Sequence, residues 1–520
     1  KEKNTRGKLI FPCGAGKSLT GYWITRELEA NNTIIAVPSL ALVKQTLEVY
    51  LEQSYANHEH LKWLCVCSDE GIGRADDVAV YTQDIGVPCV TNTDKIAEWL
   101  IKNKSKRTVV FTTYQSGEKI AEASRKAKMS FDLGIMDEAH KTVGATDKLF
   151  SHLLFDKNIS IDKRIFMTTT ERRYKGSSED VLSMDDPEMY GETFEQMSFK
   201  EAIESNILCD YKIITLFISD DEVKNLVDDN VLVKPKGSKW NAETEARTLA
   251  SLIALRKAVK KYNINHSVTF HSSIAKADAF MQSQEPFTEK YKQFSSVDAF
   301  HVAGSMPTAQ RSKIIDAFAT SKKAIITNAR CLTEGVDVPS IDGILFADPR
   351  KSTIDIVQAV GRALRKSKGK EFGYIILPVF TKSKTKEEVI NSDAFQDILM
   401  MLRALASNDE RIIEYFRDKS SGKTSSHDSV IQFDIDEQLA DVIDEKQLVE
   451  QLELTTWEKL AKISWRPFKK AKEYIQKFEF KSTTEFKKAW KEGRLAFDIP
   501  SKPRRIYKDQ GFISMPDFLG

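Results

Sequence analysis

The sequence predicts an α/β protein in which two successive parallel-sheet domains are followed by a helical C-terminal region. Three observations lead to this fold. Short apolar runs alternate with helical patterns from the start of the chain, a polar stretch interrupts the alternation, and the same pattern then begins again. The chain also has 520 residues, which is too long for one ordinary domain.

Each of the two sets contains five strand-like runs. In the first set the runs are 8–11, 33–37, 108–111, 133–136 and 164–167. In the second set they are 266–271, 298–302, 323–327, 343–347 and 373–379. Acidic and polar residues dominate about 220–243, and from residue 381 the pattern becomes helical. We therefore expect a first domain at 1–218, a connecting segment at 219–243, a second domain at 244–380, a helical region with a Ser-rich linker at 381–456, and a small basic module at 457–520.

The composition is that of a soluble globular protein, with 41% hydrophobic and 29% charged residues. No apolar run approaches the roughly 20 residues that a membrane span needs. The six cysteines lack the spacing of a zinc site or a redox pair, so we expect reduced thiols and a cytoplasmic protein, associated with the nucleoid in a bacterium. The chain begins with Lys1 instead of Met, and we expect it to be a fragment of a longer protein.

The net charge of +2 is unevenly spread. The 64 residues from 457 to 520 contain 16 Lys or Arg and 8 Asp or Glu, whereas acidic residues outnumber basic ones in the rest of the chain. A basic end on an otherwise acidic body favours contact with a polyanion, and a solvated helix face is the alternative.

A phosphate-binding loop is the first candidate site. The run Phe11–Ser18 (FPCGAGKS) lies between an expected strand and an expected helix. Its small residues let backbone N–H groups close around an anion at the helix N-terminus. Lys17 would reach the β- and γ-phosphates of ATP, and Ser18 would give an oxygen ligand to Mg²⁺. The residues expected to bind the nucleotide here are Gly14, Ala15, Gly16, Lys17 and Ser18.

Two adjacent carboxylates form the second candidate site. Asp137 and Glu138 follow the apolar run 133–136, at the end of a parallel strand where ligands bind. Asp137 is suited to hold Mg²⁺, and Glu138 is suited to orient and deprotonate an attacking water. A solvated acidic pair is the alternative, which the phosphate loop about 120 residues upstream disfavours.

These segments resemble motifs of superfamily 2 helicases of the DEAD/DEAH-box-like kind. The phosphate loop resembles motif I, and Asp-Glu-Ala-His at 137–140 resembles motif II. Met167–Thr170 resembles motif III, usually Thr-Ala-Thr, with Thr169 in place of the alanine and Glu171 in place of the proline that follows. The resemblance implies two RecA-like domains, of which the first binds ATP. It also implies that His140, Thr168 and Thr170 couple hydrolysis to movement.

The second domain resembles the family in three further segments. Val268–Ser273 resembles motif IV, Thr327–Pro339 resembles motif V, and Gln358–Arg365 matches the pattern of motif VI in full. The resemblance places Gly335 and Asp337 of motif V near the nucleotide.

Motif VI also has a physical rationale. Arg362 and Arg365 are three residues apart and are expected on one helix face, where two guanidinium groups can grip the γ-phosphate. Together with Gln358 they would complete the catalytic site from the second domain, so hydrolysis would require domain closure. A basic surface helix is the alternative.

Nucleic acid is expected to lie across the tops of both domains. The resemblance assigns phosphate contacts to motif Ia (Pro38–Gln45), motif Ib (Phe111–Ser116) and motifs IV and V, through hydroxyl and backbone N–H groups that give affinity without base choice. The candidates are Pro38, Ser39, Thr112, Thr113, His271, Ser272 and Thr327. For each of these residues alone, a turn or cap is an equal alternative.

Two segments indicate the kind of nucleic acid. The stretches 194–212 and 302–311 resemble the helicases of restriction and phage-defence systems, which implies double-stranded DNA and a nuclease domain or subunit as a partner. The tail from 465 resembles a small repeat module found beside integrases. We expect most of its aromatic residues to form a core. The cations that remain as phosphate-contact candidates are Lys469, Lys470, Arg504, Arg505 and Lys508.

The sequence therefore favours an ATP- and Mg²⁺-dependent DNA helicase or translocase without its own nuclease cluster. Two alternatives stay open: an RNA helicase, and an ATP-gated module that recruits a partner nuclease through the basic tail.

Overall fold

The computed structural model describes most of the chain. The described residues are 5–67, 88–145, 149–172, 181–228, 242–304, 306, 308–328, 338, 340–348, 352–382, 386–420, 430–435, 450, 453, 456, 468–478, 480, 482–491, 495, 499–500, 503–507 and 511–520. They belong to two compact units, one formed by Lys1–Lys382 with Val430–Leu439 and the other by Ser383–Ser429 with Ala440–Gly520. Among these residues no helix has the length and apolar character that crossing a bilayer requires.

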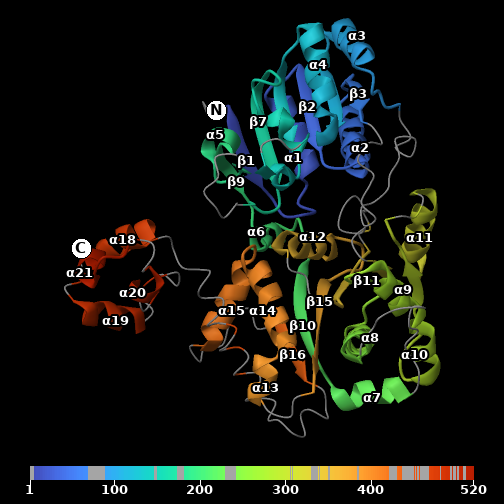
Figure 1. Ribbon diagram of the computed structural model, residues 1–520, viewed down its shortest axis with the longest axis vertical. Helices are drawn as coiled ribbons and strands as arrows, with labels where there is room; N and C mark the ends of the chain where they lie inside the picture. The colour runs from blue at the N-terminus through green and yellow to red at the C-terminus, as the bar shows by residue number, and fades with distance from the viewer. Residues whose placement is uncertain are drawn as a thin grey trace. The chain divides into compact units, whose positions relative to one another are not determined.

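The first half of the large unit is a parallel sheet of seven strands in the order β3-β4-β2-β5-β7-β1-β9, which we call the first lobe (Figure 1). The strands are β1 (Arg6–Ile10), β2 (Asn32–Val37), β3 (Lys62–Val66), β4 (Thr108–Thr113), β5 (Phe131–Met136), β7 (Ile161–Thr168) and β9 (Glu192–Gln196). The helices are α1 (Lys17–Glu27), α2 (Leu40–Ala56), α3 (Thr93–Asn103), α4 (Gly117–Ala127), α5 (Pro187–Tyr190) and α6 (Phe199–Glu204). A short antiparallel pair is formed by β6 (Gly144–Ala145) and β8 (Val181–Leu182).

Both faces of this sheet are buried. On β2, Ile34 and Ala36 belong to the core that packs against α3 and α4, whereas Ile35 and Val37 belong to the core that packs against α1 and α2. A strand that is covered on both faces carries consecutive apolar residues, which is why β2, β4 and β5 contain the runs 34–37, 109–111 and 133–136. Because helices pack on both faces of the sheet, they hold in place the strand ends at which the candidate site residues lie.

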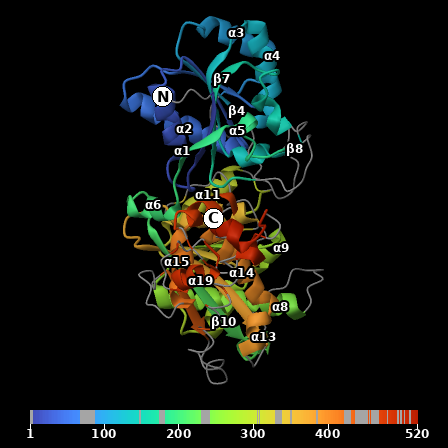
Figure 2. The ribbon, with the colours of Figure 1, turned by 90° about the vertical axis from the view of Figure 1, so that its left-hand side faces the viewer.

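The second half of the large unit repeats the architecture and is called the second lobe. Its seven parallel strands have the order β12-β13-β11-β14-β15-β10-β16. The strands are β10 (Asp210–Ser219), β11 (His266–Phe270), β12 (Asp298–His301), β13 (Ala324–Asn328), β14 (Gly343–Phe346), β15 (Phe372–Thr381) and β16 (Ile431–Ile435). The helices are α7 (Asp220–Asp228), α8 (Ala242–Tyr262), α9 (Ile274–Gln282), α10 (Gln284–Lys290), α11 (Thr308–Thr320) and α12 (Thr353–Ala363). Helix α8 packs along β10 and β15, as Figure 2 shows for β10.

The small unit is helical. Its described helices are α13 (Lys386–Asn391), α14 (Asp393–Ala406), α15 (Glu410–Ser420), α18 (Phe468–Gln476), α19 (Thr483–Lys491), α20 (Pro503–Ile506) and α21 (Met515–Leu519). Around α18 to α21, the buried Phe486, Tyr507 and Phe518 form a core with the partly buried Phe468 and Phe512. The expectation that the aromatic residues of this segment form a core is confirmed for these residues.

The predicted fold class is confirmed, and all ten expected strand runs are strands. Two strands lie outside the lobes to which the sequence boundaries would assign them. β10 begins within 1–218 but pairs with β15 over ten residues, from Asp210 beside Phe372 to Ser219 beside Thr381. β16 lies within the expected helical region and pairs with the other edge of β10. The exact domain boundaries stay a prediction.

Candidate active site

The phosphate loop bridges β1 and α1. Gly14 and Gly16 have φ values of 86° and 83°, a left-handed conformation that favours glycine, and Gly16 is the N-cap residue of α1. The loop is tied to the neighbouring strand because the N–H of Phe11 donates to the carbonyl oxygen of Thr168 at 3.0 Å. Such a loop points backbone N–H groups at an anion beside a helix N-terminus, as the sequence predicts.

Lys17 lies at the first position of α1 and is only 9% exposed. Its Nζ donates to Thr169 Oγ1 at 3.1 Å and to the carbonyl oxygen of Phe11 at 3.5 Å, and it lies 3.9 Å from Glu138 Oε1. Burial acts to lower the pKa of Lys17, but the nearby acidic groups, with Glu138 first among them, outweigh it and the pKa is raised. Lys17 is therefore a permanently charged cation in a pocket of low dielectric.

The acidic pair follows β5, as the sequence predicts. Asp137 is 4% exposed, and its Oδ1 accepts the N–H of Glu138 at 2.9 Å. Burial and then the charge of Glu138 raise the pKa of Asp137 to about 6. Burial would also raise the pKa of Glu138, but Lys17 and then His140 outweigh it and bring this pKa to about 2. The pair thus holds one firmly ionised carboxylate and one carboxylate that a cation would help to ionise.

Glu138 adopts a left-handed backbone conformation with φ 49°, which costs a non-glycine residue roughly 1–3 kcal/mol. His140 Nδ1 lies 3.3 Å from Glu138 Oε2 and 3.2 Å from Thr168 Oγ1. The hydroxyl of Thr168 also donates to the carbonyl oxygen of Thr170 at 3.1 Å. A continuous polar path therefore leads from Glu138 through His140 to the end of β7.

The second lobe reaches this path through α12. Gln358 is 4% exposed, and its Nε2 donates to Glu138 Oε2 at 3.4 Å. A Cβ placed on Gly361 would lie 2.6 Å from Cys13 Cβ, so a larger residue has no room between α12 and the phosphate loop. A Cβ on Gly14 would lie 3.2 Å from Arg365 Cγ. The structure thus brings Gln358 and Arg365 to the phosphate loop and the acidic pair.

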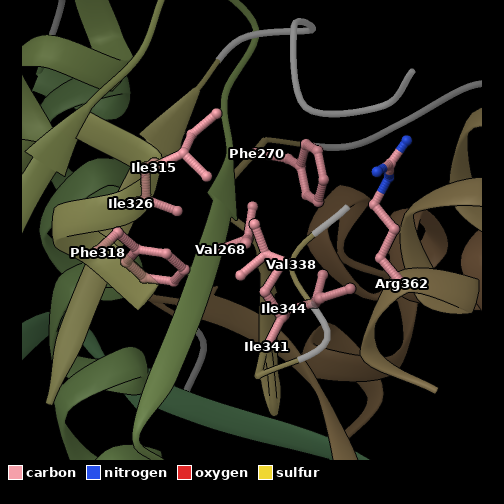
Figure 3. A pocket seen from close by; sticks show the side chains of 9 residues that line it. All are labelled: Val268, Phe270, Ile315, Phe318, Ile326, Val338, Ile341, Ile344 and Arg362. Atoms are coloured by element: carbon pink, nitrogen blue, oxygen red, sulfur yellow. The ribbon is translucent and has the colours of Figure 1, made fainter. Parts of the chain in front are cut away.

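The two arginines do not share a regular helix face. Helix α12 ends at Ala363, so Arg362 belongs to its last turn, whereas Arg365 follows it and donates its N–H to the carbonyl oxygen of Arg362 at 3.3 Å. Arg362 lines an apolar pocket inside the second lobe together with Phe270, Val338 and Ile344, and Figure 3 shows its guanidinium pointing away from the isoleucines. Arg365 is thus the arginine whose stem lies beside the phosphate loop.

Two residues that sequence reasoning missed, Cys209 and Lys370, contact the backbone at the end of α12, and a third, Leu208, lies beside the phosphate loop. The N–H of Cys209 donates to the carbonyl oxygen of Leu364 at 2.8 Å, and Leu208 Cδ2 would lie 3.3 Å from a Cβ on Gly14. Lys370 Nζ donates to the carbonyl oxygen of Arg365 at 2.7 Å, and burial lowers the pKa of Lys370. A lysine at the C-terminus of a helix complements the helix dipole, but no spacing in the sequence points to these contacts.

The candidate nucleic-acid residues of the first lobe lie at the carboxyl ends of β2 and β4. Pro38 and Ser39 are half-buried, and the Oγ of Ser39 accepts the N–H of Leu42 as the N-cap of α2. Thr112 and Thr113 are buried, and their hydroxyls donate to the carbonyl oxygen of Val66 and to Ser116 Oγ. These two hydroxyls support the strand end from within, so contact with nucleic acid at Thr112 and Thr113 remains a prediction for their backbone groups.

The second-lobe candidates have similar partners. His271 is buried and its Nε2 lies 2.9 Å from Thr269 Oγ1, while Thr327 Oγ1 lies 2.9 Å from His301 Nδ1. The N–H of Ser272 donates to Asp348 Oδ2 at 2.7 Å. Burial would raise the pKa of Asp348, but hydrogen bonds led by that from the Lys276 ammonium outweigh it, and the pKa is lowered. A phosphate at Ser272 would therefore compete with a carboxylate that sequence reasoning did not identify.

Some candidates lie outside the part of the chain that the structure describes. Gly335 and Asp337 of motif V are among them, as are Lys508 and the side chain of Arg505. Lys469, Lys470 and Arg504 are exposed on α18 and α20.

Two family models match the chain. The family of the Type III restriction enzyme res subunit matches residues 1–173, and the helicase conserved C-terminal domain matches residues 250–367. The first match covers the phosphate loop and the acidic pair, and the second ends after motif VI. The chain is therefore an ATP-dependent enzyme of the superfamily 2 helicases, of the restriction-enzyme type.

Individual related proteins have low sequence identity to this chain. The protein named Probable helicase A859L of African swine fever virus is 26% identical over 420 residues, which cover 80% of this chain and 43% of the relative. The ATP-dependent DNA helicase uvsW of Enterobacteria phage T4 is 22% identical, over 70% of this chain and 63% of the relative. The chain thus spans less than half the length of the viral relative.

A solved structure shares the fold over almost the whole chain. It is the ATP-dependent Type ISP restriction-modification enzyme LlaBIII bound to DNA, with a TM-score of 0.71 and 23% identity, over 99% of this chain and 37% of that one.

Proposed function

We propose that this chain is a motor that couples ATP hydrolysis to movement on double-stranded or partly single-stranded DNA. The observation that carries the proposal is the meeting of both lobes at Glu138: Lys17 of the first lobe lies 3.9 Å from one carboxylate oxygen, and Gln358 of the second lobe donates to the other at 3.4 Å. Groups about 120 and 220 residues away along the chain therefore surround one general base.

In this proposal each group has a chemical task. The phosphate-loop N–H groups and Lys17 hold the β- and γ-phosphates, while Arg365 and Arg362 neutralise charge on the transferring phosphoryl group. Glu138, ionised because its pKa is about 2, accepts the proton of the attacking water, and Gln358 orients the same carboxylate. Gly335 and Asp337 complete the nucleotide contacts of the second lobe.

The residues present fit a magnesium ion. Asp137 is a buried carboxylate whose raised pKa would fall beside a cation, and the half-buried Ser18 lies in the first turn of α1. Magnesium ordinarily takes one or two such protein oxygens together with phosphate oxygens and water. Ser18 and Asp137 would hold the ion, which would supply positive charge to the phosphates.

Magnesium-dependent ATP binding is expected to weaken as the pH falls through about 6, because Asp137 takes up a proton there and loses its charge. The measurement is the affinity for a fluorescent ATP analogue with and without Mg²⁺, from about pH 5 to about pH 8. The terminal phosphate of ATP also titrates near this pH. The pH profile of the affinity is therefore compared between the wild type and Asp137→Asn. An identical pH profile in both proteins would contradict the assignment of Asp137.

If ATP hydrolysis drives movement, a structural change at the active site must be transmitted to the rest of the lobe. The path from Glu138 through His140 to Thr168, which continues to the carbonyl oxygen of Thr170, is the route that we propose for this coupling. It ends at β7, next to β1 and the phosphate loop.

Duplex DNA is expected to stimulate ATP turnover at least several-fold more than RNA. The names of a relative and of a structural neighbour favour DNA, since one is called a DNA helicase and the other is bound to DNA. The test compares turnover with duplex DNA, single-stranded DNA and RNA of one sequence, with Lys17→Ala as the inactive control. Stimulation by RNA alone would favour the RNA-helicase alternative.

The proposal extends to the partners of this chain. We propose that the motor works beside a nuclease domain or subunit, as in restriction and phage-defence systems, and that it acts in the cytoplasm, on the nucleoid in a bacterium. The exposed Lys469, Lys470 and Arg504 would add contacts with the DNA backbone.

A further inference from the structure

Thr169 follows directly after β7 and touches the phosphate-loop lysine. Its hydroxyl oxygen accepts a hydrogen bond from Lys17 Nζ at 3.1 Å, in a place where Thr169 is 2% exposed and Lys17 is 9% exposed. The superfamily 2 motif that this segment resembles usually has alanine here, and the methyl group of alanine cannot accept a hydrogen bond.

The position of Thr169 follows from the sheet. β1 and β7 are parallel neighbours with Ile10 beside Thr168, and the N–H of Phe11 continues the ladder to the carbonyl oxygen of Thr168. Thr169, the first residue after β7, therefore lies at the entrance of the phosphate loop. Just beyond it, Glu171 forms an ion pair with Lys8 at 2.7 Å, and both side chains are largely buried. The end of β7 is thus tied to β1 on both sides of Thr169.

Thr169 makes the shortest contact described for the Lys17 ammonium. The carbonyl oxygen of Phe11 is 3.5 Å away, at the limit of a hydrogen bond, and Glu138 Oε1 is 3.9 Å away, which permits charge attraction without a good hydrogen bond. Because a charge attraction is not directional, the hydroxyl of Thr169 decides where the ammonium points. A second N–H group is directed at the carbonyl oxygen of Phe11, and one then remains for Glu138 or a phosphate oxygen.

We propose that Thr169 is a positioning residue for Lys17, so that its hydroxyl orients the ammonium toward the phosphates of ATP. The inference rests on the proposed role of Lys17 in nucleotide binding. It also gives the end of β7 two links to the site, because Thr168 contacts His140 while Thr169 holds Lys17. A shift of the ammonium on nucleotide binding would therefore be transmitted to the same strand end that contacts His140.

The test replaces Thr169 with valine, which keeps the branched shape and removes the hydroxyl. A hydrogen bond to a charged group corresponds to roughly a 10-fold or larger change in affinity, so Thr169→Val is expected to bind a fluorescent ATP analogue about 10-fold more weakly. Thr169→Ser keeps the hydroxyl and is expected to restore binding to within about 3-fold of the wild type. Thr33→Val is the matched control, because Thr33 is a buried threonine of β2 whose hydroxyl has no partner among the described residues.

A double-mutant cycle separates positioning from packing. In Lys17→Ala, adding Thr169→Val is expected to cause no further loss, because the hydroxyl no longer has an ammonium to orient. The inference would be overturned if Thr169→Val weakened binding of the ATP analogue equally in the wild type and in Lys17→Ala. It would also be overturned if Thr169→Val bound the analogue with wild-type affinity. If Thr169→Val lowers the melting temperature so far that the protein is not folded in the assay, Thr169→Ala is compared with Thr169→Ser instead. Equal affinities of these two variants for the ATP analogue would also overturn the inference. Wild-type binding and turnover in Lys17→Ala would instead refute the proposed function itself.

Discussion

Replacing Glu138 with glutamine is expected to lower ATP turnover by roughly a thousand-fold while the affinity for ATP is largely kept. The change removes the carboxylate to which we assign the proton of the attacking water, and it keeps the size of the side chain. Glu138 is well placed for this task because it remains ionised far below neutral pH and because Gln358 and His140 contact its second oxygen.

The measurement is single-turnover hydrolysis with the enzyme in excess over ATP, together with the binding of a fluorescent analogue. Glu192→Gln is a suitable control, since it makes the same chemical change at an exposed position of β9. Full turnover in Glu138→Gln would refute the role of Glu138 as the base.

Replacing Arg365 with alanine is expected to lower turnover by about a thousand-fold, the size of effect typical of a guanidinium that stabilises a transferring phosphoryl group. Arg365 is the better of the two arginines to test, because its stem lies against Gly14, whereas Arg362 also lines the apolar pocket of the second lobe. Arg365→Lys is expected to recover little, since an ammonium cannot reproduce the two parallel hydrogen bonds of a guanidinium.

Turnover and ATP affinity should be measured together here as well. The expected pattern is a large loss of the hydrolysis rate with a small change in affinity, because the guanidinium acts mainly in the transition state. Lys368→Ala removes an exposed positive charge from the turn that follows and serves as the control. If Lys368→Ala and Arg365→Ala reduced turnover equally, the loss would come from removing positive charge in general, and the specific role of Arg365 would be refuted.

Local patterns in the sequence were enough to predict most of the strands that are buried on both faces, although β3 and the buried β10 were not among the predicted runs. The phosphate loop and the acidic pair were predictable for the same reason, since each directly follows such a strand. β9 is the opposite case. All five of its residues are exposed, so the polar segment ETFEQ carries no strand pattern, and only its pairing with β1 makes it a strand.

The non-local contacts could not be predicted. β10 pairs with β15, which is about 160 residues further along the chain, and no local pattern specifies that partner. The contact between Thr169 and Lys17 depends on the register of β1 and β7, and the contact between Ser272 and Asp348 depends on where β11 and β14 end. The sequence indicated the groups to which we assign the chemistry but not the side chains that contact and position them.

The convergence of both lobes on one triphosphate is most directly tested by an experimental structure of this chain with ADP, aluminium fluoride and Mg²⁺. Lys17 and the Arg365 guanidinium are expected to contact the fluoride that mimics the transferring phosphoryl group, with Glu138 hydrogen-bonded to the water in line with it. A complex in which Arg365 points into solvent and Gln358 is far from Glu138 would contradict the shared site.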